Sequence, residues 1–198
     1  MDYEQKFNSM IIFDTSKVLP IVEKIKSGRT IYELVSKDTG VPWYVIGIVH
    51  YKECSCNFNL HLHNGDPLTA RTVRVPAGRP KTGNPPFPWA YSARDALADR
   101  PNKDWSINGT LYWLEAYNGF GYTNLKVTNP YLWAGSQYYT KGLYVRDGVY
   151  DPNVVWTGVG CALIMKYLLE KPIIVPQKSK WEIWTEKIKA ALAVLKKR

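Results

Sequence analysis

The sequence predicts an α+β fold in which helices predominate and one small β-hairpin packs beside them. Two segments, Pro42 to Lys52 and Val154 to Leu169, are apolar almost all round, which is typical of helices buried at the centre of a domain. The stretch from Leu60 to Val75 alternates, turns and returns, as a hairpin does. A small sheet surrounded by helices gives the α+β class. The 198 residues, 45% of them hydrophobic, suit a single domain over 1–198.

Two patterns mark where helices begin. Thr30 and Glu33 form a capping box, in which the two side chains bond reciprocally to free backbone N–H groups, so a helix is expected from residue 31. Asp151 precedes Pro152, which places an N-cap before a proline at the first helical position. The second apolar helix is therefore expected to start near residue 152.

Two further helices are expected later in the chain. Asp104 can cap a helix that runs through Tyr117. Ser179 and Glu182 form a second capping box, which opens a basic amphipathic helix over about 180–197. Its apolar stripe is expected either to pack on the domain or to lie on anionic lipid.

The predicted hairpin is followed by a long connection. The segments Leu60–His63 and Thr69–Val75 are the expected strands, and Asn64-Gly65-Asp66 has the composition of the turn between them. From Pro76 to Pro88 the chain is rich in Pro, Gly and basic residues, which predicts an ordered surface loop beside a cleft.

The charge and the cysteines limit the functional classes. Twenty-six Lys and Arg against seventeen Asp and Glu give a net charge of +9, which favours polyanionic partners such as nucleic acid, anionic lipid or bacterial wall. No helix-turn-helix, zinc-finger or RNP-type pattern accompanies this charge, so a nucleic-acid partner is not expected. Three cysteines form no disulfide framework. The sequence shows no signal peptide and no membrane-spanning stretch, which predicts synthesis in a reducing cytoplasm.

Two carboxylates stand in unlike surroundings. Glu53 lies where the first apolar helix runs out into polar sequence, a place where partial burial raises the pKa of an acid. Asp66 follows thirteen residues later in a turn that is expected to be polar and exposed. Glycosidases use such a pair of carboxyl groups in catalysis, and the different environments give the two groups different pKa values.

Several motifs resemble a known superfamily. A helix that ends in Glu53, followed far downstream by Glu115-Ala116-Tyr117-Asn118-Gly119, resembles the goose-type lysozyme and soluble lytic transglycosylase superfamily. Asn57 to Pro67 and Pro67 to Pro80 are more similar to the lysozyme-like endolysins of bacteriophages. The resemblance covers about residues 30 to 170. Two features depart from it, because Cys54 replaces the usual serine and the Gly-Leu-Met-Gln element of the transglycosylases is absent.

The resemblance implies a lysozyme-like fold with a cleft beside the hairpin, and roles for particular residues. Glu53 would be the general acid, and Asp66 would activate water, with Thr69 and Thr72 as alternatives for holding it. A tyrosine that matches Tyr117 lines the cleft in the resembling enzymes. The residues expected to bind substrate are His63, Thr69, Thr72, Tyr117, Tyr122, Trp133 and Tyr139.

A metal site is the competing interpretation of the histidines. His61 and His63 are two residues apart, so they share one face of a strand, but no third ligand accompanies them. Hydrogen bonding around Asp66 is the expected use of His63. No metal and no cofactor are expected.

The predicted function is that of a phage-type endolysin, a glycoside hydrolase. It would cut the β-1,4 bond between N-acetylmuramic acid and N-acetylglucosamine in peptidoglycan. The chain is expected to act as a monomer, to wait in the host cytoplasm, and to reach the wall after a membrane lesion. Its C-terminal helix is a candidate contact to anionic outer-membrane lipid. The alternatives are a lytic transglycosylase at the same bond, a chitinase-like activity, and a non-catalytic protein that binds peptidoglycan or nucleic acid.

Overall fold

Helices make up most of the regular structure. The structure, a computed structural model, describes residues 2–98, 104–146 and 148–169. In these ranges the one sheet has two antiparallel strands, so the predicted α+β class with a helical majority is confirmed. The elements in chain order are α1 (Tyr3–Asn8), the 3₁₀ helix η1 (Thr15–Lys17), α2 (Val18–Ser27), α3 (Arg29–Thr39), α4 (Trp43–Cys54), α5 (Trp89–Ala98), α6 (Ile107–Asn118), α7 (Gly121–Asn124), α8 (Pro130–Trp133), β1 (Leu143–Arg146), β2 (Val149–Asp151) and α9 (Cys161–Leu169).

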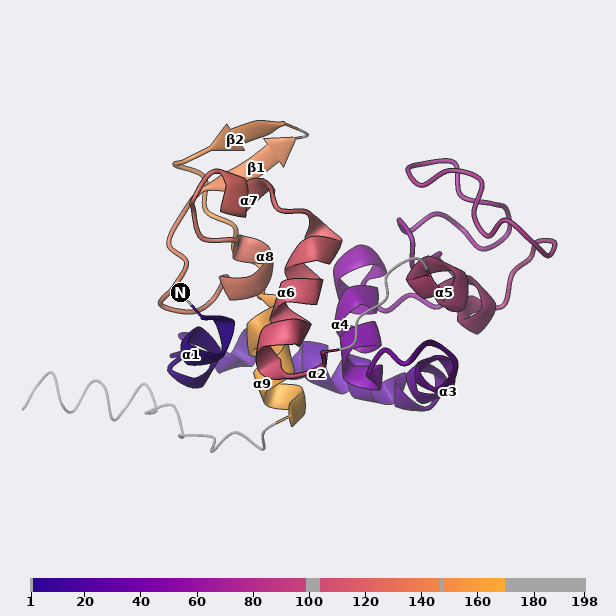
Figure 1. The fold of residues 1–198 in the computed structure, drawn as a ribbon, viewed down its shortest axis with the longest axis horizontal. Coiled ribbons are helices and arrows are strands. Elements are labelled where there is room, and N and C mark those ends of the chain that lie inside the picture. Colours follow the sequence, from indigo (N-terminus) through magenta and orange to yellow (C-terminus); the bar gives the residue numbers. More distant parts are fainter. Residues whose placement is uncertain (1, 99–103, 147, 170–198) are drawn as a thin grey trace, which may run out of the picture.

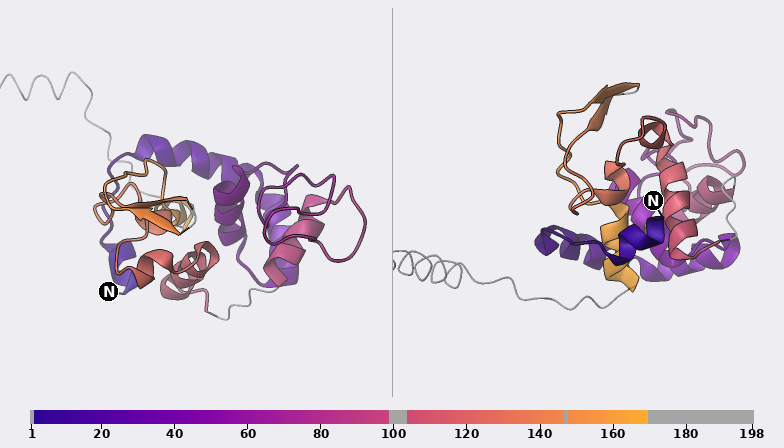
Figure 2. Two further views of the ribbon diagram at one scale, coloured as in Figure 1. Left: turned by 90° about the horizontal axis from the view of Figure 1, so that it is seen from above. Right: turned by 60° about the vertical axis from the view of Figure 1, so that its left-hand side comes forward.

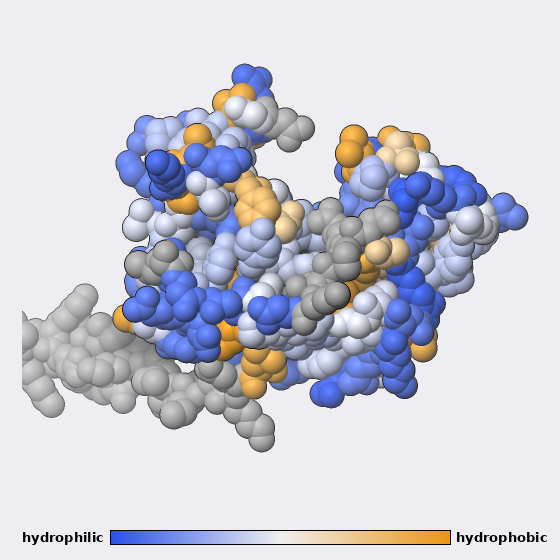
Figure 3. All heavy atoms as spheres, in the orientation of Figure 1, coloured by the Kyte–Doolittle hydropathy of each residue, from blue (hydrophilic) through white to orange (hydrophobic). Residues whose placement is uncertain are grey.

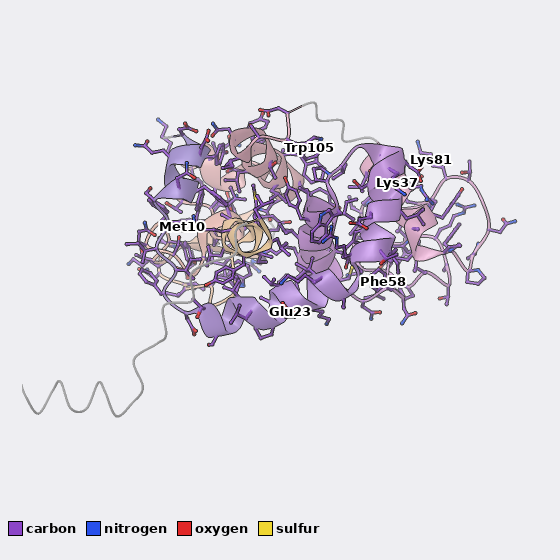
Figure 4. The ribbon with its side chains drawn as sticks, turned by 90° about the horizontal axis from the view of Figure 1, so that it is seen from below. Met10, Glu23, Lys37, Phe58, Lys81 and Trp105 are labelled. Atoms are coloured by element: carbon purple, nitrogen blue, oxygen red, sulfur yellow. The ribbon has the colours of Figure 1, made fainter. Side chains whose placement is uncertain are left out.

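Helix α4 is the centre of the core, as its sequence predicts. Its buried side chains face in all directions, and it packs against α2, α3, α6 and α9. Val45, Ile46, Ile48 and Val49 are each fully buried. A helix with no polar face has to be covered on every side, which explains why four other helices surround it. Figure 4 views this packing from below, with labelled Phe58 stacked on Tyr32 of α3.

The sheet lies where the sequence did not predict it. Strands β1 and β2 pair with Leu143 opposite Asp151 and Tyr144 opposite Tyr150. The hairpin expected over Leu60–Val75 is wrong, because this segment holds only an isolated bridge between Leu60 and Pro67.

Local hydrogen bonding explains why residues 60–75 form a loop. The carboxylate of Asp66 accepts the backbone N–H groups of Val73 and Arg74, at 2.8 and 3.0 Å, so these donors are not available to a partner strand. His61 and Leu62 are both fully buried, whereas a half-buried strand would alternate. The segment is therefore an irregular loop that its own side chains hold together.

The start of the last helix also differs from the expectation. Asp151 belongs to β2, and its carboxylate accepts the N–H of Asn153 at 2.8 Å in a tight turn instead of capping a helix. Helix α9 begins only at Cys161, after an irregular stretch over 152–160. Asp151 therefore belongs to the strand that pairs with β1, although the sequence predicted that it caps a helix.

Two other helix starts shift by a few residues. Helix α3 begins at Arg29 without a side-chain cap, and Glu33 pairs with Arg29 at 2.7 Å instead of completing a capping box. In α6 the cap is Ser106, which accepts the N–H of Gly109, while Asp104 accepts the N–H of Ser106 one step earlier. The helix that was expected from the aspartate to residue 117 is confirmed with this later start.

Two lobes stand on either side of α4 and α6 (Figure 1). The β1–β2 hairpin and α7 form the top of one lobe, and α5 with the long loop over 55–88 forms the other. Both views of Figure 2 keep the hairpin and this loop apart. In the described ranges no helix is both long and apolar enough to cross a membrane. The basic helix expected over 180–197 lies outside the described residues.

Gly160 allows α8 and α9 to approach closely, and this contact can be tested. A Cβ at position 160 would lie 2.2 Å from the carbonyl oxygen of Leu132 and 2.8 Å from the nitrogen of Ala134, and backbone atoms cannot rotate away. Gly160→Ala is therefore expected to lower the free energy of unfolding by about 1 to 3 kcal/mol, measured by urea denaturation. Thr157→Ala, at an exposed position in the same loop, is the control and should change it by less than about 0.5 kcal/mol. Equal stability of the two variants would contradict the close packing.

Candidate active site

Glu53 lies in the last turn of α4, where the buried helix ends. Two non-glycine residues follow in the left-handed region, Ser55 at φ 51° and Cys56 at φ 56°. Their N–H groups bond back to the carbonyls of Tyr51 and His50, at 2.9 and 3.1 Å, and close the helix. Left-handed residues other than glycine are strained, and such strain gathers at functional sites. The chain turns sharply here and leaves the glutamate half-buried at the helix end.

The end of α4 lies at the base of a surface hollow. Figure 3 shows this hollow between the lobe that carries the β1–β2 hairpin and the lobe formed by the loop over 55–88. Helix α6 ends beside α4, and the hydroxyl of Tyr117 in its last turn donates to the carbonyl of Leu62 at 3.1 Å, which ties α6 to the loop. The base of the hollow is thus formed by two helix ends and braced by a tyrosine.

A lysine that the sequence did not single out stands beside the glutamate. The Nζ of Lys52 lies 4.0 Å from the ring centre of Trp156 and 4.5 Å from that of Tyr131, and it donates to the carbonyl of Val159 at 3.3 Å. Burial lowers the pKa of Lys52, while the neighbouring Cys161 and Glu53 act in the opposite direction. Two aromatic faces thus hold a partly desolvated cation on the residue that precedes Glu53.

Tyr131 and Cys161 complete the surroundings of Glu53. The hydroxyl of Tyr131 is buried and lies near the Cys161 thiol and Glu53. Burial, then the neighbouring Cys161 and Glu53, raise its pKa well above the usual value, so it stays protonated and can donate. Burial likewise raises the pKa of the Cys161 thiol to about 12, which excludes a thiolate nucleophile at neutral pH.

Asp66 is buried, which corrects the expectation of an exposed turn carboxylate. One oxygen accepts the Arg74 Nε at 2.6 Å, and the other accepts the N–H groups of Val73 and Arg74. Burial by itself raises the pKa of Asp66, but the hydrogen bonds from Arg74 and Val73 outweigh it and lower the pKa to about 2. Both oxygens are engaged in holding the loop, which gives this carboxylate a structural role.

Gly65 fits the loop against the helix end. Its φ is +73°, and a Cβ there would lie 3.2 Å from the carbonyl oxygen of Glu53. A side chain at this position is therefore both strained and obstructed. The turn that carries Asp66 consequently packs directly on the last turn of α4.

The histidines are structural. His63 is not accessible to a substrate, since its side chain is 3% exposed and its Nε2 lies 2.8 Å from the Asp95 carboxylate, not from Asp66 as expected. Arg79 shares that carboxylate at 2.8 Å, which joins the loop to α5. His61 uses both ring nitrogens, toward the hydroxyl of Ser92 and the carbonyl of Ala70. Among the described residues no group of three or more His, Cys, Asp and Glu side chains could hold a metal ion.

The two threonines have different surroundings. Thr72 is buried, and its hydroxyl donates to the carbonyl of Pro76 at 2.5 Å and accepts the N–H of Arg79 at 2.9 Å, so it is occupied within the loop. Thr69 is exposed on the same loop. Of the two, only Thr69 remains accessible to a ligand.

The four predicted aromatic residues do not form one site. Tyr117 donates to the carbonyl of Leu62, and Tyr122 borders a cavity of about 390 Å³ with Asn118 and Arg146. Trp133 is buried and, together with Glu115, borders a second cavity of about 300 Å³. Tyr139 borders a third cavity, of about 200 Å³. Trp133 and Tyr139 are thus core residues of the hairpin lobe. The sequence signal that could have identified the missed neighbours is the charge of Lys52 inside an otherwise apolar helix.

Comparisons of the chain with protein-family models, with curated proteins and with solved structures find no match.

The structural role of Asp66 can be tested by acid titration. Its folded-state pKa is lowered from 3.8 to about 2, so its stabilising contribution is complete above pH 3.8 and is lost as the pH falls toward 2. Asp66→Asn is expected to cost about 1.5 to 3 kcal/mol of unfolding free energy at pH 7, because hydrogen bonds to a charged group are lost. The difference from the wild type should shrink between pH 4 and pH 2, measured by urea unfolding.

Asp38→Asn is the matched control for this experiment. Asp38 pairs with Arg94 at the surface, where the loss should stay below about 1 kcal/mol. If both asparagine variants lose the same small amount, Asp66 does not hold the loop as described.

Proposed function

We propose that the protein cleaves the glycan strands of peptidoglycan at the β-1,4 bond between N-acetylmuramic acid and N-acetylglucosamine, with a lysozyme-like fold and Glu53 as the general acid. The observation that carries the proposal is the position of this carboxylate. It is half-buried at the end of an apolar helix, and its charge acts on Lys52 and on the buried hydroxyl of Tyr131. The sequence resemblance supports the same assignment.

In this mechanism the Glu53 carboxyl group protonates the oxygen of the leaving sugar. The glycosidic bond then breaks through an oxocarbenium-like transition state. The carboxylate that remains is stabilised by the charge of Lys52, its neighbour in the chain. The buried hydroxyl of Tyr131, which stays protonated near Glu53, helps to orient the glutamate.

The second proton transfer also falls to Glu53 in this proposal. Asp66 was the predicted base, but each of its oxygens already accepts hydrogen bonds within the loop. A single carboxylate then acts as acid and afterwards as base. The acceptor of the sugar is either water, which gives hydrolysis, or the C6 hydroxyl of the muramic acid residue itself, which gives a lytic transglycosylase.

The engaged state of Asp66 favours keeping the transglycosylase as a second candidate, because that reaction needs no second carboxylate. Mass spectrometry of the products from purified peptidoglycan separates the two. Hydrolysis leaves reducing ends, and intramolecular attack leaves anhydro-muramic ends. A protein that only binds the wall releases no product.

Glu53→Gln is expected to lower the rate of strand cleavage by about 10² to 10⁴-fold while the protein still folds, because the amide has a similar size but cannot donate the proton. Release of soluble muropeptides from purified peptidoglycan is the measurement. Glu23→Gln, at an exposed position on α2 that pairs with Lys26, is the control and should retain full activity. Full activity of Glu53→Gln would remove Glu53 from the mechanism, whereas the absence of any soluble product from the wild type would leave the binding protein as the explanation.

A further inference from the structure

The loop over 71–79 holds two apolar side chains in solvent. Val75 is 89% exposed and Val73 is 79% exposed, the highest values among the large apolar side chains of the described ranges. Single exposed apolar residues are common on protein surfaces. Two of them, separated by one residue on the same loop, are a feature that needs a reason.

The exposure does not come from a loosely held chain. The carboxylate of Asp66 binds the backbone of Val73 and Arg74 directly, and the amide of Asn64 donates to the carbonyl of Arg74 at 2.9 Å. The N–H of Thr72 donates to the carbonyl of Arg79 at 2.8 Å across the base of the loop. The valines are thus presented by a backbone that buried polar groups fix in position.

The chain from this loop into α5 is rich in basic residues, three of which pair with the carboxylates of Asp66, Asp95 and Asp38. Between Asp66 and Asp95 the chain has no acidic residue, whereas it has five basic ones. Arg74 stands between the two valines, and its side chain is 64% exposed although its Nε pairs with Asp66. The five basic residues are Arg71, Arg74, Arg79, Lys81 and Arg94.

The location connects this surface with the hollow. The long loop forms one of its two walls, and Figure 3 shows apolar side chains at the top of that wall, facing the opposite lobe. A strand bound at the base of the hollow would therefore pass next to this tip. Its partner needs small apolar groups for the valines and negative charge for the arginine.

We propose that the tip formed by Val73, Arg74 and Val75 binds the stem peptide that branches from the glycan strand. This inference rests on the proposed function, and it names the part of the substrate that the loop recognises. Stem peptides carry alanine methyl groups, which pack on valine, and free carboxylates, which pair with arginine. A glycan whose peptides an amidase has removed lacks these alanines and their carboxylates and keeps only the lactyl group of each muramic acid. The loop therefore makes the enzyme selective for peptide-bearing strands.

The test compares two substrates with one double variant. Val73→Ser with Val75→Ser removes the apolar contact and leaves the anchors of the loop in place. Cleavage is measured on strands that carry stem peptides and on strands from which an amidase has removed them. The double variant is expected to lose about tenfold in kcat/KM on peptide-bearing strands and to match the wild type on bare strands. Val145→Ser with Val149→Ser, on the opposite lobe, is the control and should leave both values unchanged.

Equal losses on the two substrates would overturn the assignment, because the valines would then contact sugar, and unchanged values on both would overturn it as well. Sedimentation of the protein with each kind of strand supplies a second readout that needs no cleavage. If the wild type cleaves neither substrate, the proposed function fails. The inference then still stands or falls on whether the double variant binds peptide-bearing strands about tenfold more weakly than the wild type does.

Discussion

The rest of the structure depends on the burial of α4. Its sequence has no polar face, so the fold must cover it on every side, and α2, α3, α6 and α9 do so. Each fully buried Val or Ile of this helix contributes about 1.5 to 3 kcal/mol relative to exposure. The helix leaves the core at its last turn. A carboxylate placed there is held by a helix that is packed on every side, and it still borders solvent.

Asp66 and Glu53 are both carboxylates, but their different neighbours suit the first to a structural role and the second to the proposed chemistry. Asp66 receives three donors from the loop, which stabilise its ionised form and bind the loop to it. Glu53 has the cation of Lys52 and the buried hydroxyl of Tyr131 among its neighbours. The first arrangement suits an anchor, and the second suits a group that changes its protonation during a reaction.

Asp66, which anchors the loop, lies in a turn that packs against Glu53, the proposed acid. Gly65 lets the turn that carries Asp66 pack on the carbonyl of Glu53, and Asp66 in turn holds the segment with Val73 and Arg74. The end of α4 therefore positions both the proposed chemistry at the base of the hollow and the proposed recognition at its rim. A substitution in the anchor should act on both through the shape of the loop.

The sequence alone determined the central helix and the helical majority of the fold, and it suggested Glu53 as the candidate acid, because an uninterrupted apolar run and the charge at its end are local features. Only the tertiary structure decided the partners of the polar groups. Asp151 pairs within a sheet instead of capping a helix, Asp66 is saturated by residues 73 and 74, and His63 binds Asp95. The Nζ of Lys52 in α4 lies over the rings of Tyr131 in α8 and Trp156 before α9, and both rings are more than 75 positions away in the chain. Such contacts depend on how distant segments pack, and local periodicity contains no information about them.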